Sequence, residues 1–148
     1  MGCGFFGIAM YHPKNIHNWG SLMRSANIMG VNFIATIGRR FPKQASDTLK
    51  TYRHLPIFEF SDFDDFKSHL PFGCQLIGIE LVDDAKLLED FQHPQQACYL
   101  LGAEDMGLPK SIINQCHKLV KLQGKHSMNV SCAGSIVMYH RKSMRGKK

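Results

Sequence analysis

The sequence contains no long apolar run, no paired cysteines and no acidic residue from position 106 onward. A membrane helix needs roughly 20 apolar residues, so we expect no transmembrane segment. The five cysteines never form C-x-x-C and the eight histidines never form H-x-x-x-H. We therefore expect reduced thiols, no disulfide framework and no metal site.

Basic and acidic residues are strongly segregated along the chain. Residues 1–58 hold seven Lys/Arg and one acid, residues 59–105 hold two and eleven, and residues 106–148 hold nine and none. If the two basic ends meet, they form a positive face suited to phosphate, with the acidic block pointing elsewhere. For the basic C-terminal tail alone, a solvated stretch without a specific role stays an alternative.

The 148 residues are enough for one domain with its own core, and no repeat or linker is visible. Short apolar runs predict strands at 5–11, 31–38, 57–60, 74–81, 97–102 and 119–124. Helices are predicted at 20–30, ended by Gly30, at 61–70, capped by Ser61, at 108–119 and within 126–140. This alternation predicts an α/β fold with a largely parallel sheet and helices on both faces.

Three turns after predicted strands stand out, because such turns bind ligands in parallel sheets. In the first, Asn18 can cap a helix, and Arg24 shares a helical face with Gly20 and can reach an anion at the helix start. In the second, two glycines bracket Glu104 and allow a nucleoside-sized ligand close to the backbone; this turn lacks the dinucleotide fingerprint. A capped surface helix and a simple glycine-rich connection are the respective alternatives.

The third turn, "HSMNVS", places Ser127 where it can cap the last helix. Asn129 then falls inside the first helical turn, where asparagine is a poor helix former, so we expect another role for it. An over-polar cap is the alternative. Behind it, Ala133, Gly134 and Ser135 are small enough for another element to pack closely.

Three motifs occur in order: Asn-x-Gly-x-x-x-Arg at 18–24, Gly-x-Glu-x-x-Gly-Leu-Pro at 102–109 and Ser-Met-Asn-Val-Ser at 127–131. Together they resemble the TrmH (SpoU) branch of the SPOUT methyltransferases, in its minimal catalytic-domain type, over residues 5–141. The resemblance implies one domain over 1–148 with a C-terminal trefoil knot, and a homodimer with the active site near the subunit interface. It also implies transfer of a methyl group from S-adenosylmethionine to a ribose 2′-hydroxyl of RNA, tRNA or rRNA.

The resemblance also implies roles for individual residues. The cofactor-binding positions are Ile79, Glu80, Leu101, Gly102, Leu122, Ser127 and Met128. The catalytic positions are Arg24, Glu104, Ser127 and Asn129. A guanidinium keeps its charge near neutral pH, so we favour Arg24 as a clamp on phosphate and ribose over a role as general base. The sequence departs from the family at "LQGK", with Gln123 where proline is usual.

RNA contacts are expected from Asn18 and from the basic 39–53 segment. The candidates for backbone contacts are Arg39, Arg40, Lys43, Lys50 and Arg53. Phe41 and Tyr52 can stack on a splayed base, whereas a solvated loop is the alternative. A catalytically inactive RNA-binding or ribosome-assembly factor, or a nucleotide-cofactor oxidoreductase, remains a competing function. The N-terminal residues lack the basic region of a secretory signal, and Phe6 stands where myristoylation needs Ser or Thr, so we expect a cytoplasmic protein.

Overall fold

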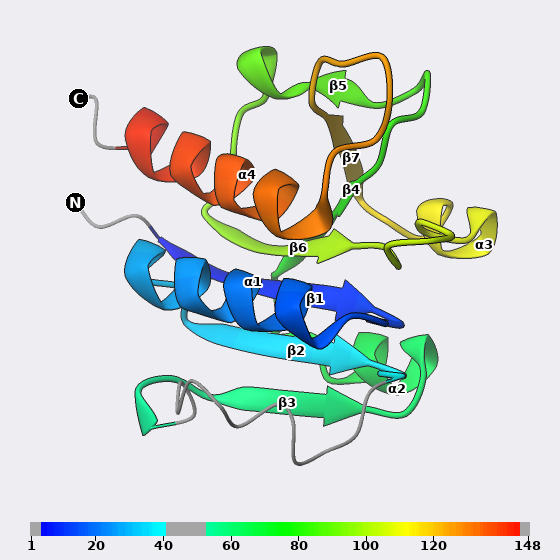
Figure 1. The fold of residues 1–148 in the computed structure, drawn as a ribbon. Coiled ribbons are helices and arrows are strands. Elements are labelled where there is room, and N and C mark those ends of the chain that lie inside the picture. Colours follow the sequence, from blue (N-terminus) through cyan, green and yellow to red (C-terminus); the bar gives the residue numbers. More distant parts are fainter. Residues whose placement is uncertain (1–3, 41–52, 146–148) are drawn as a thin grey trace.

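The computed structural model describes residues 4–40 and 53–145, which form a sheet with helices on both faces (Figure 1). Its seven strands are paired in parallel, in the order β3-β2-β1-β6-β4-β7-β5. The strands are β1 (Phe5–Tyr11), β2 (Phe33–Ile37), β3 (Ile57–Phe60), β4 (Gln75–Ile79), β5 (Lys86–Leu87), β6 (Gln96–Leu101) and β7 (Lys118–Lys121). The predicted α/β class is confirmed.

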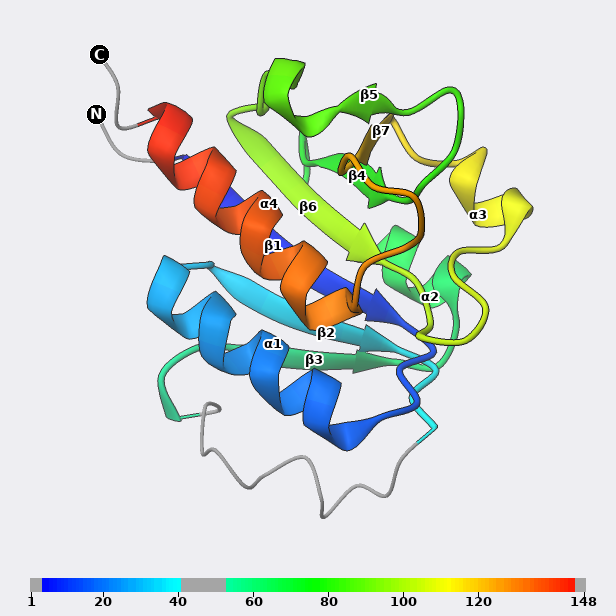
Figure 2. The same ribbon diagram turned by 45° about the horizontal axis from the view of Figure 1, so that its top comes forward.

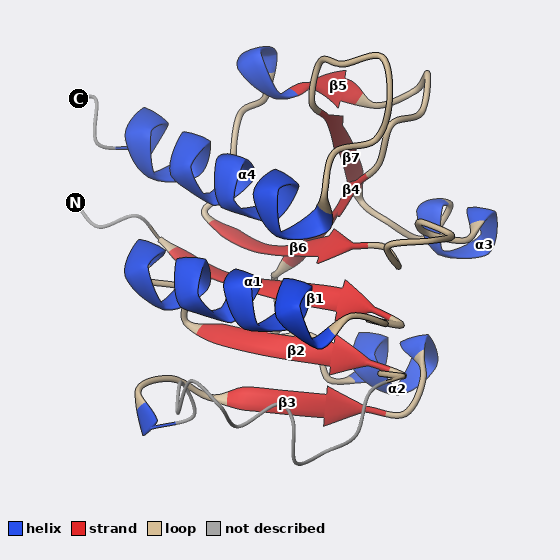
Figure 3. Ribbon diagram, viewed as in Figure 1, coloured by secondary structure: helices blue, strands red, loops and turns tan. Residues whose placement is uncertain are grey.

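The helices divide between the two faces of the sheet. Helices α1 (Ile16–Met29) and α4 (Val130–Arg145) lie side by side on one face, and α2 (Phe63–Ser68) lies on the other (Figures 2 and 3). The short α3 (Lys110–Ile113) joins the same apolar cluster as α2 through Ile112. A 3-10 turn, η3, spans Leu88–Asp90.

The central strands are buried on both sides, which explains their continuous apolar sequences. In β1, Phe6, Ile8 and Met10 join the cluster beneath α1 and α4, whereas Ala9 joins the cluster beneath α2. In β6, Tyr99 belongs to the first cluster. Since side chains alternate across a strand, each central strand contributes to both cores.

Gly134 sets how closely α4 packs. A Cβ atom at this position would lie 2.6 Å from Leu22 of α1 and 2.9 Å from Leu101 of β6, which is closer than carbon atoms can pack. The predicted close approach at the small residues 133–135 is therefore confirmed, and it joins α4 to both the neighbouring helix and the sheet.

The helix ends differ from the sequence prediction in three places. Asn15, and not Asn18, caps α1 by accepting hydrogen bonds from His17 N and Asn18 N. Asp62, and not Ser61, caps α2. Asn129, and not Ser127, caps α4, since its Oδ1 accepts from Ser131 N at 2.9 Å and from Cys132 N at 3.3 Å. Each predicted cap was a chemically suitable neighbour, because polar residues cluster at helix starts.

The sequence predicted the end of α1 correctly but not the two shortest elements, β5 and α3. The predicted end of α1 at Gly30 is confirmed, with φ 77°, a left-handed conformation that favours glycine. Strand β5 was missed because two residues carry no detectable alternation, and α3 is much shorter than the predicted 108–119 helix. A G-x-G-x-x-G spacing does occur at residues 2–7, but its last glycine, Gly7, lies within β1, whereas a dinucleotide turn has its glycines after the strand.

A chain of buried and half-buried hydrogen bonds joins the end of α4 to the sheet. The fully buried Arg141 donates from Nη1 to Tyr99 Oη (3.0 Å), and its guanidinium lies 4.8 Å from the centre of the Phe6 ring. Tyr99 Oη lies 2.6 Å from His93 Nδ1, and His93 Nε2 lies 2.8 Å from His140 Nδ1. Burial lowers the pKa of His93 to about 3, with further contributions from His140, Arg141 and Arg145.

None of the helices in the described ranges is both long enough and apolar enough to cross a membrane.

Candidate functional site

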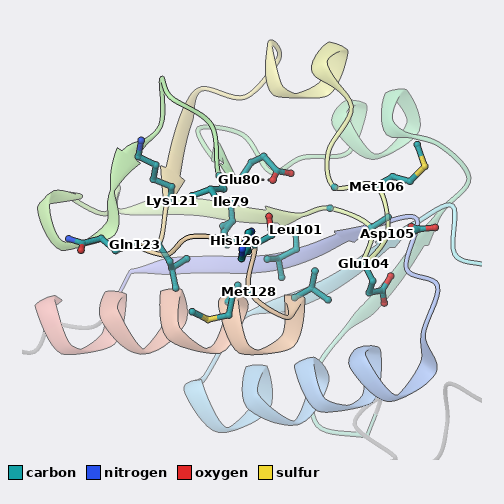
Figure 4. Close-up of a pocket in the computed structure, with 18 residues that line it drawn as sticks. Ile79, Glu80, Leu101, Glu104, Asp105, Met106, Lys121, Gln123, His126 and Met128 are labelled. Carbon is teal, nitrogen blue, oxygen red and sulfur yellow. Dashed lines mark hydrogen bonds between the residues drawn. The ribbon is translucent and has the colours of Figure 1, made fainter.

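A cavity of about 270 Å³ opens where β4, β6 and β7 end (Figure 4). The carboxyl ends of neighbouring parallel strands meet at one edge of the sheet, so turns from distant parts of the chain line the same space. The second and third predicted turns both contribute to its wall. The lining residues are Ile79, Glu80, Leu81, Leu101, Gly102, Ala103, Glu104, Asp105, Met106, Gly107, Lys121, Leu122, Gln123, His126, Ser127, Met128, Val130 and Ala133.

The cavity brings together most of the predicted site residues. All those predicted to bind the cofactor line it, namely Ile79, Glu80, Leu101, Gly102, Leu122, Ser127 and Met128. Of the residues predicted to be catalytic, Glu104 and Ser127 line it as well. The convergence of these positions is a property of the structure, whereas their roles remain predictions.

The wall formed by the 102–107 turn depends on its two glycines. A Cβ atom at Gly102 would collide with the backbone of Gly107 and Leu108, because the turn folds back on itself through paired hydrogen bonds between Ala103 and Gly107. Gly107 has φ 65°, and a Cβ there would lie 2.7 Å from Glu80 Oε2. The sequence can therefore form this compact wall only with glycine at both positions.

Glu80 fixes the wall from the β4 side. Its Oε1 accepts a hydrogen bond from Leu81 N at 3.1 Å, and its Oε2 accepts one from Leu108 N at 2.9 Å. Apolar side chains lie beside it, since Ile79 and Leu101 are buried and line the same cavity (Figure 4). The cavity thus combines an apolar surface with a carboxylate held in place by backbone amides.

Glu104 joins the first two predicted turns. Its carboxylate accepts hydrogen bonds from Lys14 N (2.9 Å) and Asn15 N (3.1 Å) at the start of α1. Its Oε1 also lies 3.5 Å from Asn18 Nδ2. A carboxylate is favoured at a helix N-terminus, where backbone N–H groups are unpaired and the helix dipole is positive.

Asn18 extends this connection to the third turn. Its Oδ1 accepts a hydrogen bond from Asn129 Nδ2 at 2.9 Å. Asn129 meanwhile caps α4 through Oδ1, which also accepts from Ser131 Oγ at 2.8 Å. All three motifs are therefore joined by one hydrogen-bonded series, Glu104 to Asn18 to Asn129, and the polar start of α4 is explained by this junction.

Arg24 does not line the cavity of its own chain. It lies on the exposed side of α1, whereas the opposite side of the helix is buried through Trp19, Leu22, Met23 and Ala26. The predicted grouping of Arg24 with the 101–104 and 127–129 turns is thus not formed within the described part of a single chain.

The candidate RNA-binding residues differ in their surroundings. Arg39 pairs with Glu59 at 2.8 Å, and Arg40 forms a two-pronged ion pair with Asp105 at 2.8 and 3.2 Å. Arg53 is exposed just before β3, whereas Lys43, Lys50, Phe41 and Tyr52 lie outside the described residues. The expectation that the acidic block points away from the basic residues is wrong for Glu59 and Asp105, because opposite charges attract at short range.

The ion pair between Arg40 and Asp105 shifts the pKa of both groups. The hydrogen bond from Arg40 lowers the pKa of Asp105 to about 2, and the same bond raises the pKa of Arg40. The pair therefore remains ionised throughout the neutral range.

Burial disfavours the thiolate form of three cysteines. It raises the pKa of Cys74 and of Cys116 to about 11, and it also raises the pKa of the fully buried Cys98. Within residues 4–40 and 53–145, no group of His, Cys, Asp and Glu side chains could hold a metal ion.

Sequence reasoning missed several cavity residues. Asp105 and Met106 line the wall from variable positions of the second motif, and Lys121, Gln123 and His126 line it from outside the three motifs. Their nearness in sequence to Glu104, Leu122 and Ser127 was the only signal available. Lys14 and Asn15, which hold Glu104, gave no signal because their contribution comes from backbone amides.

The profile of the SpoU rRNA Methylase family matches residues 6–139. The chain belongs to this family. A SpoU family relative, the "Putative TrmH family tRNA/rRNA methyltransferase" of Staphylococcus haemolyticus, is 25% identical over 134 residues, which are 83% of this chain and 52% of the relative. The tRNA (guanosine(18)-2′-O)-methyltransferase of Saccharomyces cerevisiae is 25% identical over 133 residues, 82% of this chain and 9% of that protein. The chain thus spans about half of the bacterial relative and a small part of the yeast one.

Solved structures share the SpoU family fold. The AdoMet-bound rRNA methyltransferase of Sinorhizobium meliloti has a TM-score of 0.84 at 19% identity and covers 95% of this chain and 57% of its own. A structure from work on the 2-OH methylation of C/U34 on tRNA has a TM-score of 0.85 at 20% identity, over 99% of this chain and 100% of its own. These likenesses establish a SPOUT-type fold for the chain.

Proposed function

We propose that the chain is an S-adenosylmethionine-dependent RNA methyltransferase that acts on a ribose 2′-hydroxyl of tRNA or rRNA. Membership of the SpoU family supports the reaction class. The observation that carries the proposal is the meeting of three separate motifs at one cavity edge through Glu104, Asn18 and Asn129. A ribose hydroxyl as acceptor is supported by the activity named for the yeast relative.

The cavity fits the chemistry of the proposed cofactor. A bent nucleoside needs apolar surface for its base, which Ile79, Leu101 and Leu122 offer, and exposed backbone for its polar edge, which Gly102 offers. The carboxylates of Glu80, Glu104 and Asp105 suit the positive charges of a sulfonium and an ammonium group. S-adenosylmethionine, when bound, supplies an electrophilic methyl group.

The chain's own residues have positioning roles in this proposal. Ser127 lines the cavity with an exposed hydroxyl and can orient the ribose. Asn129 and Glu104 are both hydrogen-bonded to Asn18, so they hold their two turns in fixed positions relative to each other. Methyl transfer is an in-line displacement, so alignment of the hydroxyl with the methyl carbon can supply much of the rate.

A second copy of the chain completes the proposed site. Arg24 lies outside the cavity of its own chain, on a surface of α1 that also exposes Ile28. The neighbouring α4 exposes Ile136 and Tyr139, and large apolar side chains at a surface favour an interface. In a homodimer formed by α1 and α4, Arg24 of one copy can clamp RNA at the cavity of the other.

The test is to incubate the protein with S-adenosylmethionine labelled in its methyl group and with separate tRNA and rRNA fractions. We expect label in 2′-O-methylated nucleosides from one fraction, identified by mass spectrometry. Calorimetry with S-adenosylmethionine distinguishes the alternative. RNA binding without any cofactor binding would contradict the proposal and favour an inactive RNA-binding or assembly factor.

A further inference from the structure

Arg40 ties together the turns that follow β1, β2 and β6. It lies three residues beyond the end of β2, at Ile37. Its Nη1 and Nη2 bind the Asp105 carboxylate in the turn after β6. Its Nε and Nη2 also donate to His12 O, at 3.1 and 2.9 Å, in the turn after β1. One guanidinium therefore holds the carboxylate of one turn and the carbonyl of another.

His12 is held in an unusual conformation at this junction. Its φ is 47°, the only positive value among the described residues other than glycine. Such a backbone is costly for a residue with a side chain, and it persists where its surroundings fix it. Here the His12 ring stacks on Tyr11 with centroids 4.1 Å apart, while Arg40 fixes the carbonyl. The bend is thus built around the Arg40 contact.

Asp105 connects this junction to the cavity. It lines the cavity wall and follows Glu104 directly, so both carboxylates belong to the same turn. Glu104 binds the backbone of Lys14 and Asn15, and the Lys14 ammonium lies 3.7 Å from Asp105. The cavity turn is therefore attached to its neighbours at two adjacent positions, one of which depends on Arg40.

Arg39 provides a contrast from the same segment. It also pairs with a carboxylate, Glu59 of β3, at 2.8 Å. Glu59 does not line the cavity. Both arginines lead into the 41–52 segment, but only the partner of Arg40 is part of the cavity wall.

We propose that Arg40 and Asp105 form a positioning pair that couples RNA binding to cofactor binding. The inference rests on the proposed function. RNA phosphate can replace a carboxylate as the two-pronged partner of a guanidinium, and Arg40 is exposed enough to accept it. When Arg40 turns to RNA, Asp105 loses its partner and the 102–107 turn is held less firmly. RNA and S-adenosylmethionine therefore weaken each other's binding, and to the same extent.

The experiment measures the affinity of the full chain for S-adenosylmethionine by calorimetry, with and without a tRNA fraction. Asp105→Asn removes the carboxylate charge, and we expect about three- to fivefold weaker cofactor binding, the range of a well-aligned exposed ion pair. The same change frees Arg40, so tRNA binding becomes tighter. Arg40→Gln removes the partner of Asp105 and leaves the cavity wall itself unchanged, so we expect a similar loss of cofactor affinity together with weaker tRNA binding.

Glu59→Gln is the matched control. It removes a carboxylate that pairs with an arginine of the same segment but does not line the cavity, so we expect unchanged cofactor affinity. Equal cofactor affinities for Arg40→Gln and Glu59→Gln, with both variants folded by thermal melting, would overturn the inference. An absence of cofactor binding by the unmodified chain would instead overturn the proposed function.

Discussion

Asn129 Nδ2 donates a hydrogen bond to Asn18 Oδ1 across 2.9 Å, although 111 residues separate them in the sequence. The same Asn129 caps α4 with its other amide atom. One side chain thus determines both where the last helix begins and how that helix meets the first one. This relationship also explains why an asparagine with low helix propensity occupies the position.

Replacing Asn129 by alanine removes both the cap and the connection to Asn18. We expect the free energy of unfolding to fall by about 2 kcal/mol, roughly one from the cap and one from the hydrogen bond. Asn129→Asp keeps the oxygen that caps α4 but places a second acceptor opposite Asn18 Oδ1. It should therefore lose only the contribution of the hydrogen bond to Asn18. Urea unfolding measures both changes, and identical losses for the two variants would contradict the double role.

Asn15→Ala is the control for this comparison, because it removes the cap of α1 alone. We expect the free energy of unfolding to fall by about 1 kcal/mol, the contribution of one helix cap.

The stability of the fold should decrease below about pH 6.5. The native pKa of His93 is about 3, because of its burial and then the nearby His140, Arg141 and Arg145. In the unfolded chain a histidine binds its proton near pH 6.5. The unfolded state therefore binds more protons between these values, and the stability present above pH 6.5 is lost as pH falls towards 3, by at most about 1.4 kcal/mol per unit.

His93→Gln should flatten this part of the pH profile, measured by urea unfolding from pH 7 to pH 4. The exposed His54 serves as the control, and His54→Gln should leave the slope as it is. An unchanged slope in His93→Gln would show that other groups dominate acid unfolding.

Arg24→Ala should abolish methyl transfer while S-adenosylmethionine still binds, since Arg24 lies outside the cavity. Gly102→Val disrupts the 102–107 turn of the cavity wall, so it should lose both activities. If Arg24 serves the cavity of the second copy, the two variants can complement each other when they are mixed in equal amounts and refolded together. About half of the dimers are then mixed, and one of the two sites in each mixed dimer has both an intact cavity and an intact Arg24. About a quarter of all sites should therefore be active. Activity assays of the mixture measure this, and no recovery would contradict action between copies.

RNA binding should weaken strongly with salt. Between about 50 and 200 mM salt we expect at least a tenfold loss of affinity, because released counterions dominate binding by a basic surface. Arg53→Gln should reduce the slope of log affinity against log salt by about one. Filter binding measures both, and a flat response would exclude the basic segments as the RNA-binding surface. Cofactor affinity over the same range is the internal control.

The sheet could be predicted from sequence because its strands carry short, continuous apolar runs. The ranges 5–11 and 57–60 coincide with β1 and β3, and the convergence of distant turns followed from parallel strand geometry. The helix starts could not be fixed, since Ser127 and Asn129 are equally good caps and only the contact with Asn18 distinguishes them. The trefoil knot and the homodimer implied by the family resemblance remain predictions.

The Arg40 to Asp105 pair lay beyond sequence reasoning for another reason. The two residues are 65 positions apart, and block charges suggested that acids and bases would occupy different faces. The distribution of charge along the sequence describes the average electrostatic field of the protein. Individual ion pairs depend instead on which turns meet in the fold. The cavity residues outside the motifs, such as His126, were missed because nothing in their local sequence distinguishes them.

Gly134 lets α4 pack closely because its side chain is a single hydrogen atom. It does not line the cavity, yet α4 packs on Leu22 and Leu101 at this point, and Val130 and Ala133 of the same helix do line it. An added methyl group would meet the ends of the Leu22, Leu101 and Ile8 side chains, so these side chains or the helix would have to move. Because Leu101 also lines the cavity, a change in this core position would be felt at the cavity wall without a change in any lining residue.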